Sequence, residues 1–193
     1  MSSFRQLMMR KKTQTLNATV VGSPTISSDF VVSNINLNNY LYINNVQIPT
    51  SDNFTIQLKF QRKDGGSVPT QPIIWLNTLG QIGFSTYRGY WWFWWFGVDA
   101  GASNTTAGLG KDIWYWLRIV SFSSGETKFY ISTTGAFAGE EVLLLSATRT
   151  TSGTITSFRL GCSNSEYINA DIDMKECWAK KTDGTYTYWQ GVI

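Results

Sequence analysis

The sequence predicts an all-β protein, a sandwich or a barrel of short antiparallel strands. Three observations lead to this prediction. Several segments alternate apolar and polar residues with the period of two that a half-buried strand requires, as in residues 54–60. Clusters of Gly, Ser, Asn and Asp separate these segments. No segment after residue 28 has a convincing helical period, and about ten short strands favour a sandwich or barrel over alternating helices and strands.

Each expected strand has its own signal. In residues 112–122, the side chains of Tyr115, Leu117 and Ile119 share one face, and a turn at 123–125 leads into the next strand. A second turn signal lies at 63–66, and a hairpin signal at 183–184 precedes the last strand. In chain order, the expected strands are residues 54–60, 73–76, 81–84, 90–96, 112–122, 127–132, 142–145, 155–160, 170–179 and 186–189.

Composition excludes several function classes. The chain of 193 residues suits one domain, with 15% aromatic residues available for a core. It has no histidine, which rules out Ser-His-Asp and Cys-His catalysis and every His-ligated metal site. Two cysteines are too few for a disulfide scaffold or a zinc cluster. No apolar stretch approaches the roughly 20 residues that span a bilayer, so we expect no membrane insertion.

Positive charge is concentrated at the N-terminus. Residues 1–28 hold four basic residues and no acidic one, a charge of +4, whereas the rest holds 12 basic and 13 acidic residues, 12 − 13 = −1. The body therefore lacks a basic face by count, and we expect no nucleic-acid partner.

The N-terminal residues 1–28 are expected to form a basic tail and an extended linker, and residues 29–193 the folded domain. Phe4, Leu7 and Met8 have the spacing of one face of a short helix, which could order on a partner. A frayed terminus is an equal alternative. The candidate docking residues are Phe4, Arg5, Leu7, Met8, Arg10, Lys11 and Lys12.

Two segments resemble a known family. Residues 114–120 and 128–135, which read WYWLRIV and KFYISTTG around a glycine turn, resemble a hairpin of concanavalin A-like lectin and glucanase jelly rolls. Residues 172–181, IDMKECWAKK, are similar to the closing strand of members found on bacteriophage structural proteins, and residues 2–9, SSFRQLMM, resemble the opening of such proteins. The resemblance implies two curved antiparallel sheets, with a concave face that binds glycans in lectin relatives. It also implies a virion protein assembled in the host cytoplasm.

The run of seven aromatic residues at 90–96 is the strongest feature of the body. In a strand, Trp91, Phe93 and Trp95 share one face, and one of the two faces must fill the core. The sequence leaves open which one. Tyr90, Trp92, Trp94 and Phe96 share the other face. Whichever set is exposed, a row of Trp and Tyr on an open concave face suits stacking against sugar rings. The alternatives are that both faces are buried, or that the exposed set is a protein interface. The candidate carbohydrate-binding residues are Tyr87, Arg88, Tyr90, Trp92 and Trp94.

One motif suggests catalysis. Asp171, Asp173 and Glu176 have the spacing D-x-D-x-x-E, close to the E-x-D-x-x-E of glucanases with this fold. In those enzymes paired carboxylates on a bulged strand cleave glycosidic bonds. Here the first position is the shorter Asp, the motif lies near the chain end, and the string IDxKEC also occurs in non-catalytic relatives. We therefore expect no enzyme activity.

The cysteines and the acidic loops give weaker signals. Cys162 and Cys177 could pair across late strands, although burial as a free thiol is favoured. Glu140 and Glu141 could hold calcium, but no D-x-D-x-D-G loop is present, and no cofactor is expected.

Two functions follow from these observations. The first is a glycan-binding module on a phage particle, tethered by its tail to capsid, tail or fibre proteins and recognising cell-surface polysaccharide. The second is a purely structural virion protein that decorates a particle or forms a fibre, with its aromatic face against protein. In both cases we expect a homo-oligomer. A glycoside hydrolase ranks third.

Overall fold

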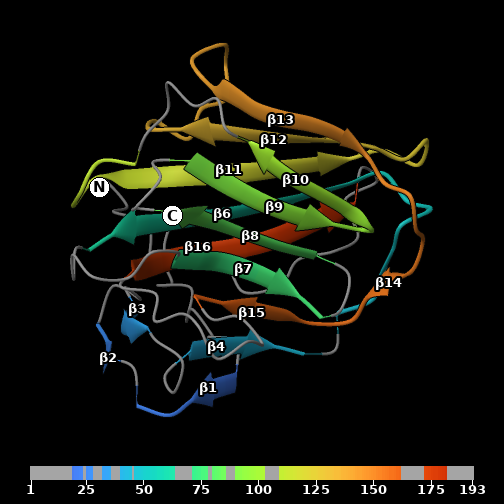
Figure 1. The fold of residues 1–193 in the computed structure, drawn as a ribbon. Coiled ribbons are helices and arrows are strands. Elements are labelled where there is room, and N and C mark those ends of the chain that lie inside the picture. Colours follow the sequence, from blue (N-terminus) through green and yellow to red (C-terminus); the bar gives the residue numbers. More distant parts are fainter. Residues whose placement is uncertain are drawn as a thin grey trace, which may run out of the picture.

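Alternating apolar residues form two antiparallel sheets of seven strands each (Figure 1). The structure is a computed structural model, and it describes residues 19–23, 25–27, 32–35, 40–44, 46–63, 71–77, 80–85, 90–102, 109–161 and 172–181. Strands and loops make up these ranges, with no helix among them, which confirms the prediction of an all-β sandwich. None of the described residues forms a helix long and apolar enough to cross a membrane.

Both sheets combine strands that are distant in sequence. The first sheet has the order β1 (Thr19–Val21), β4 (Tyr40–Ile43), β15 (Phe158–Leu160), β7 (Gln71–Leu76), β8 (Gly80–Ser85), β9 (Tyr90–Trp95) and β10 (Val98–Ala102). The second has the order β13 (Val142–Thr148), β12 (Glu126–Ser132), β11 (Trp114–Ser121), β6 (Phe54–Arg62), β16 (Ile172–Lys181), β3 (Val32–Ile35) and β2 (Thr25–Ile26). A separate ladder joins β5 (Ile48–Pro49) to β14 (Thr154–Ile155).

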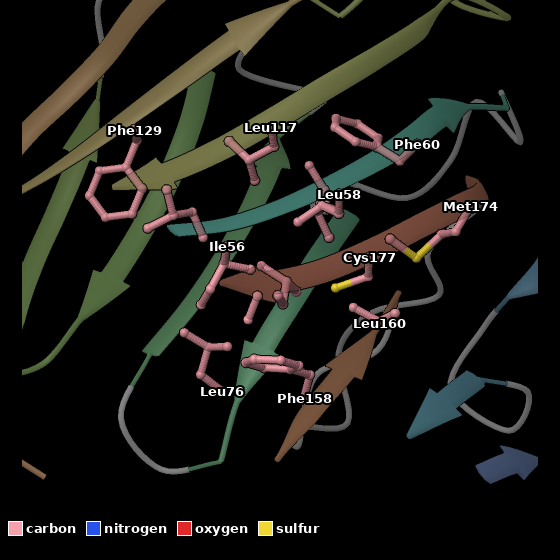
Figure 2. Packing of buried hydrophobic residues seen from close by; sticks show 14 of the residues in the cluster. Ile56, Leu58, Phe60, Leu76, Leu117, Phe129, Phe158, Leu160, Met174 and Cys177 are labelled. Atoms are coloured by element: carbon pink, nitrogen blue, oxygen red, sulfur yellow. The ribbon is translucent and has the colours of Figure 1, made fainter. Parts of the chain in front are cut away.

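The core lies between the two sheets. In β11, Leu117 and Ile119 are fully buried, and Tyr115 is nearly so, which confirms the predicted face. Figure 2 shows side chains of the second sheet, among them Leu58, opposite Phe158 of the first sheet. Each of these buried side chains stabilises the fold by roughly 1.5–3 kcal/mol relative to an exposed one.

The linker and one strand differ from expectation. β1 and β2 lie in the stretch predicted as linker; they are extended, but each pairs at a sheet edge, with β4 and with β3. The paired part of the chain therefore begins before residue 29, because β-branched side chains favour a pleated edge. The docking residues at 4–12 lie outside the described residues, and their role stays a prediction.

The expected strand at 155–160 is two strands in different ladders. The Thr156 amide donates a hydrogen bond to Asn77 Oδ1 at 3.3 Å, and its carbonyl accepts one from the Val46 amide at 3.2 Å. These loop contacts interrupt the ladder and redirect the chain, so that β14 pairs with β5 while β15 enters the first sheet. The hairpin expected at 183–189 lies outside the described residues.

Candidate functional site

The structure decides which face of the aromatic run is buried. Phe93 and Trp95 are fully buried. The ring centroids of Phe93 and Phe129, from the opposite sheet, are 4.8 Å apart. The Trp95 indole meets Phe129 edge-on at 5.1 Å, and its Nε1–H donates a hydrogen bond to Thr127 Oγ1 at 3.2 Å. Phe93 and Trp95 therefore belong to the core.

One member of the predicted even-numbered set is also buried. Phe96 is 1% exposed, because β9 ends at Trp95 and Phe96 begins a turn with a φ of 46°. The prediction that Phe96 continues the alternation of positions 90, 92 and 94 was wrong, since strand alternation stops at the turn. Within β9, positions 90, 92 and 94 alternate with the buried Phe93 and Trp95. Tyr87 and Arg88 lie outside the described residues.

The register aligns one residue from each of six strands across the first sheet. The register pairs position 94 with position 81 on β8 and position 99 on β10. Position 81 pairs in turn with Trp75, Trp75 with Arg159, and Arg159 with Tyr42. We call this set the transverse row: Tyr42, Arg159, Trp75, Gln81, Trp94 and Asp99. Sequence reasoning missed it, because its members lie on six strands that are scattered along the chain.

A cluster of rings surrounds Arg159 at the centre of this row. The guanidinium carbon lies 4.9 Å from the ring centroid of Trp75, 5.5 Å from that of Tyr40 and 5.8 Å from that of Tyr42. Arg159 is half-buried and stands between the fully buried Phe158 and Leu160, so it points away from the core. Stacking of this kind stabilises a cation by about 0.5–2 kcal/mol. We call these four residues the Arg159 cluster.

The motif that suggested catalysis lies on the outer face of the second sheet. In the ladder with β6, Asp173 pairs with Gln61, and Glu176 pairs with Lys59. A bulge between Met174 and Glu176 brings both acidic residues to the face shared by positions 59 and 61. Asp171 lies outside the described residues.

Each of these two acidic side chains is bound by a neighbour. Asp173 forms an ion pair with Lys63 at 3.3 Å. Glu176 Oε1 accepts a hydrogen bond from Trp116 Nε1–H at 2.9 Å, and burial raises the pKa of Glu176. The Lys59 ammonium lies 4.0 Å from the Trp116 ring centroid. These contacts give both carboxyl groups a structural role.

A rigid loop covers part of the same face. Glu140 accepts hydrogen bonds from the Ser132 and Thr134 hydroxyls, at 2.7 and 2.6 Å, and from the Phe137 amide at 3.0 Å. Hydrogen bonds from the Thr134 hydroxyl, the Ser132 hydroxyl and the Ala138 amide hold the pKa of Glu140 far below its usual value. The loop then places the Phe137 ring 3.6 Å from the Arg118 guanidinium carbon. Arg118 Nε–H also donates to Gln57 Oε1 at 2.9 Å.

The structure also locates the acidic residues considered for metal binding and one of the two cysteines. Among the residues that the structure describes, no group of three or more His, Cys, Asp or Glu could hold a metal ion. Glu140 and Glu141 both accept hydrogen bonds from backbone amides of their own loop. Cys177 is free and fully buried, and burial raises the pKa of its thiol. Cys162 lies outside the described residues.

Comparisons with known proteins give structural neighbours but no sequence relatives. No protein-family model matches the chain, and no curated protein matches it. The fold is similar to the crystal structure of the botulinum neurotoxin serotype D binding domain, with a TM-score of 0.59 at 12% identity. That match covers 90% of this chain and 43% of the other.

Two further neighbours are similar. One is the binding domain of botulinum neurotoxin DC in complex with SialylT, with a TM-score of 0.58 and 10% identity over 91% of this chain and 43% of that one. The other is a botulinum neurotoxin type C structure, with a TM-score of 0.54 and 13% identity over 92% and 44%. Its description states that cell entry depends upon interaction with two ganglioside molecules. The chain thus spans less than half the length of these neighbours, and at such identities the likeness shows the β-sandwich fold alone.

Proposed function

We propose that this protein is a non-catalytic module that binds a glycan through the outer face of its first sheet. The observation that carries the proposal is the burial of Phe93 and Trp95, because it supports an outer position for 92 and 94, which alternate with them in β9. Position 94 then lies in the transverse row with Trp75 and Arg159. Support also comes from the structural neighbours: two are binding domains, one of them in complex with SialylT, and a third concerns cell entry dependent upon interaction with two ganglioside molecules.

The residue types of the transverse row suit a sugar. The C–H face of a pyranose packs on an indole or phenol ring, and nearby amides and carboxylates bind its hydroxyls. The row alternates these types, with aromatic residues at positions 42, 75 and 94 and polar ones at 81 and 99. Neighbouring strands are about 4.8 Å apart, so positions 75 and 94, two strands apart, are separated by about 10 Å. A glycan of a few linked sugars would cross both.

Titration with polysaccharides tests the proposal. We expect the double variant Trp92→Ala, Trp94→Ala to lose binding while its far-UV circular dichroism is unchanged. Trp114→Ala, on the outer face of the second sheet, is the matched control and should bind as the wild type does. If only Trp114→Ala lost binding, the site would lie on the second sheet and the proposal for the first sheet would be wrong. A folded wild type that binds no polysaccharide would exclude the function.

We also propose that the module is part of a phage particle. It rests on the resemblance of the closing strand to phage structural proteins and on the basic residues at 5–12. In this proposal the tail segment docks on another virion protein and leaves the sandwich free to bind the cell surface. Normal incorporation of a protein lacking residues 1–12 into particles would contradict it.

A second candidate is a structural virion protein that acts through protein contacts. The observation that favours it is the apolar edge strand β13, where Val142 is 41% and Leu143 is 50% exposed. An edge strand with exposed apolar side chains is a template for pairing with another chain. Sedimentation of the wild type and of Leu143→Lys distinguishes the candidates, because a β13-mediated homo-oligomer should dissociate in the variant and a monomeric glycan-binding module should be unaffected.

A further inference from the structure

We infer that the glycan bound by the first sheet is acidic, and that Arg159 selects it by binding a sugar carboxylate. The inference rests on the proposed function and names the ligand class of that site. Its basis is the position of the Arg159 guanidinium among the three rings of the Arg159 cluster.

The Arg159 cluster holds the guanidinium in a defined place. β15 lies inside the first sheet, with β4 on one side and β7 on the other. Phe158 and Leu160, on either side of Arg159 in the chain, are fully buried and pack β15 against the core. The rings of Trp75, Tyr40 and Tyr42 lie within 4.9–5.8 Å of the guanidinium carbon. A side chain confined in this way loses little rotamer entropy when a ligand binds.

The chemistry of a stacked arginine favours a carboxylate. Ring stacking uses the flat face of the guanidinium, whereas hydrogen bonding uses the N–H groups at its edge. These N–H groups form a fork that matches the two oxygens of a carboxylate. A uronic or nonulosonic acid carries its carboxylate directly on the pyranose ring. One such sugar would therefore pack its C–H face on Trp75 and place its carboxylate at Arg159, one strand away.

The second sheet offers a contrasting arginine. Arg118 also lies over a ring, with its guanidinium carbon 3.6 Å from the Phe137 centroid, but the carboxylates of Glu140 and Glu141 interact electrostatically with it. An acidic ligand would meet these carboxylates first. Arg118 is therefore the matched control, a stacked arginine on the opposite outer face.

Calorimetric titration of the full chain with defined polymers tests the inference. The probes are polygalacturonate, the same polymer after reduction of its carboxyl groups, polysialic acid and neutral dextran. We expect the wild type to bind at least one acidic polymer. If it binds polygalacturonate, it should bind that polymer at least tenfold more tightly than the reduced form. Arg159→Gln should weaken acidic binding at least tenfold, Arg159→Lys should fall between, and Arg118→Gln should have no effect.

The possible outcomes separate the inference from the function on which it rests. Equal binding of the charged and reduced polymers overturns the acidic preference and leaves glycan binding in place. An Arg159→Gln variant that binds as the wild type does, with an unchanged melting temperature, overturns the role of Arg159. Absence of binding to every polymer, charged or neutral, overturns the proposed function itself. The comparison of the acidic polymers with reduced polygalacturonate and with neutral dextran uses the wild type alone, so it decides whether the ligand is acidic even if an arginine variant does not fold.

Discussion

Replacing Phe93 with Ala should destabilise the protein far more than replacing its neighbour Trp94, although tryptophan is the larger residue. Phe93 is fully buried, and its ring packs 4.8 Å from Phe129 of the opposite sheet. Truncating a buried phenylalanine costs about 3–5 kcal/mol, through lost burial and the cavity that remains. In the proposed glycan-binding face position 94 points outward, where a cross-strand pair contributes about 0.2–1 kcal/mol.

Urea unfolding followed by far-UV circular dichroism measures this difference. Circular dichroism is preferable to fluorescence, because the Trp94 variant removes an indole from the signal. Since folded domains are stable by about 5–15 kcal/mol, the loss at Phe93 is a large fraction of the total. We expect a gap of about 2 kcal/mol or more between the two variants. Equal losses of stability in the two variants would mean that both faces of β9 are buried. Position 94 would then not lie on an outer face, and the glycan-binding proposal would fail.

Further predictions concern the second sheet and its loops. Burial raises the pKa of Glu176, so the folded protein holds this proton more tightly than the unfolded chain. The contribution of Glu176 to stability is therefore greatest below its pKa in the unfolded chain and is lost as pH rises through its pKa in the folded protein. Over that pH range the stability of Glu176→Gln, measured by urea titration, should rise relative to that of the wild type. Parallel pH profiles of the two proteins would contradict this prediction. Gly135→Ala should destabilise by more than about 1 kcal/mol, because φ is 76° and the new Cβ would lie 2.7 Å from the Trp116 ring. Gly139→Ala is its control, with a φ of 104° and no atom within 4 Å of the Cβ, and equal thermal shifts for the two variants would exclude the steric cost. Arg149→Met should cost about 1–3 kcal/mol in thermal unfolding, because it removes the Arg149 hydrogen bonds to the carbonyls of Thr50, Phe122 and Ser123, of which that of Phe122 keeps a bond from the Gly125 amide; an unchanged stability would refute that role.

Some strands could be predicted from the sequence because their signal is local. The predicted strands at 54–60 and 127–132 correspond to β6 and β12, where alternating side chains are bounded by a polar turn. Strands such as β4 and β10 escaped detection, because segments of four or five residues carry too little periodicity to stand out. The division of residues 155–160 between two ladders depends on contacts to Asn77 and Val46, which no local pattern contains.

The sequence by itself determined the all-β class and the division of β9 into two alternating sets, because the period of a strand is a property of its own backbone. Only the tertiary structure decided that Phe93 and Trp95 belong to the core, since burial depends on which sheet lies opposite. It alone also placed Arg159 between Tyr42 and Trp75. Strand order and register are set by long-range pairing, and that pairing assembles the candidate site from residues that are far apart in the chain.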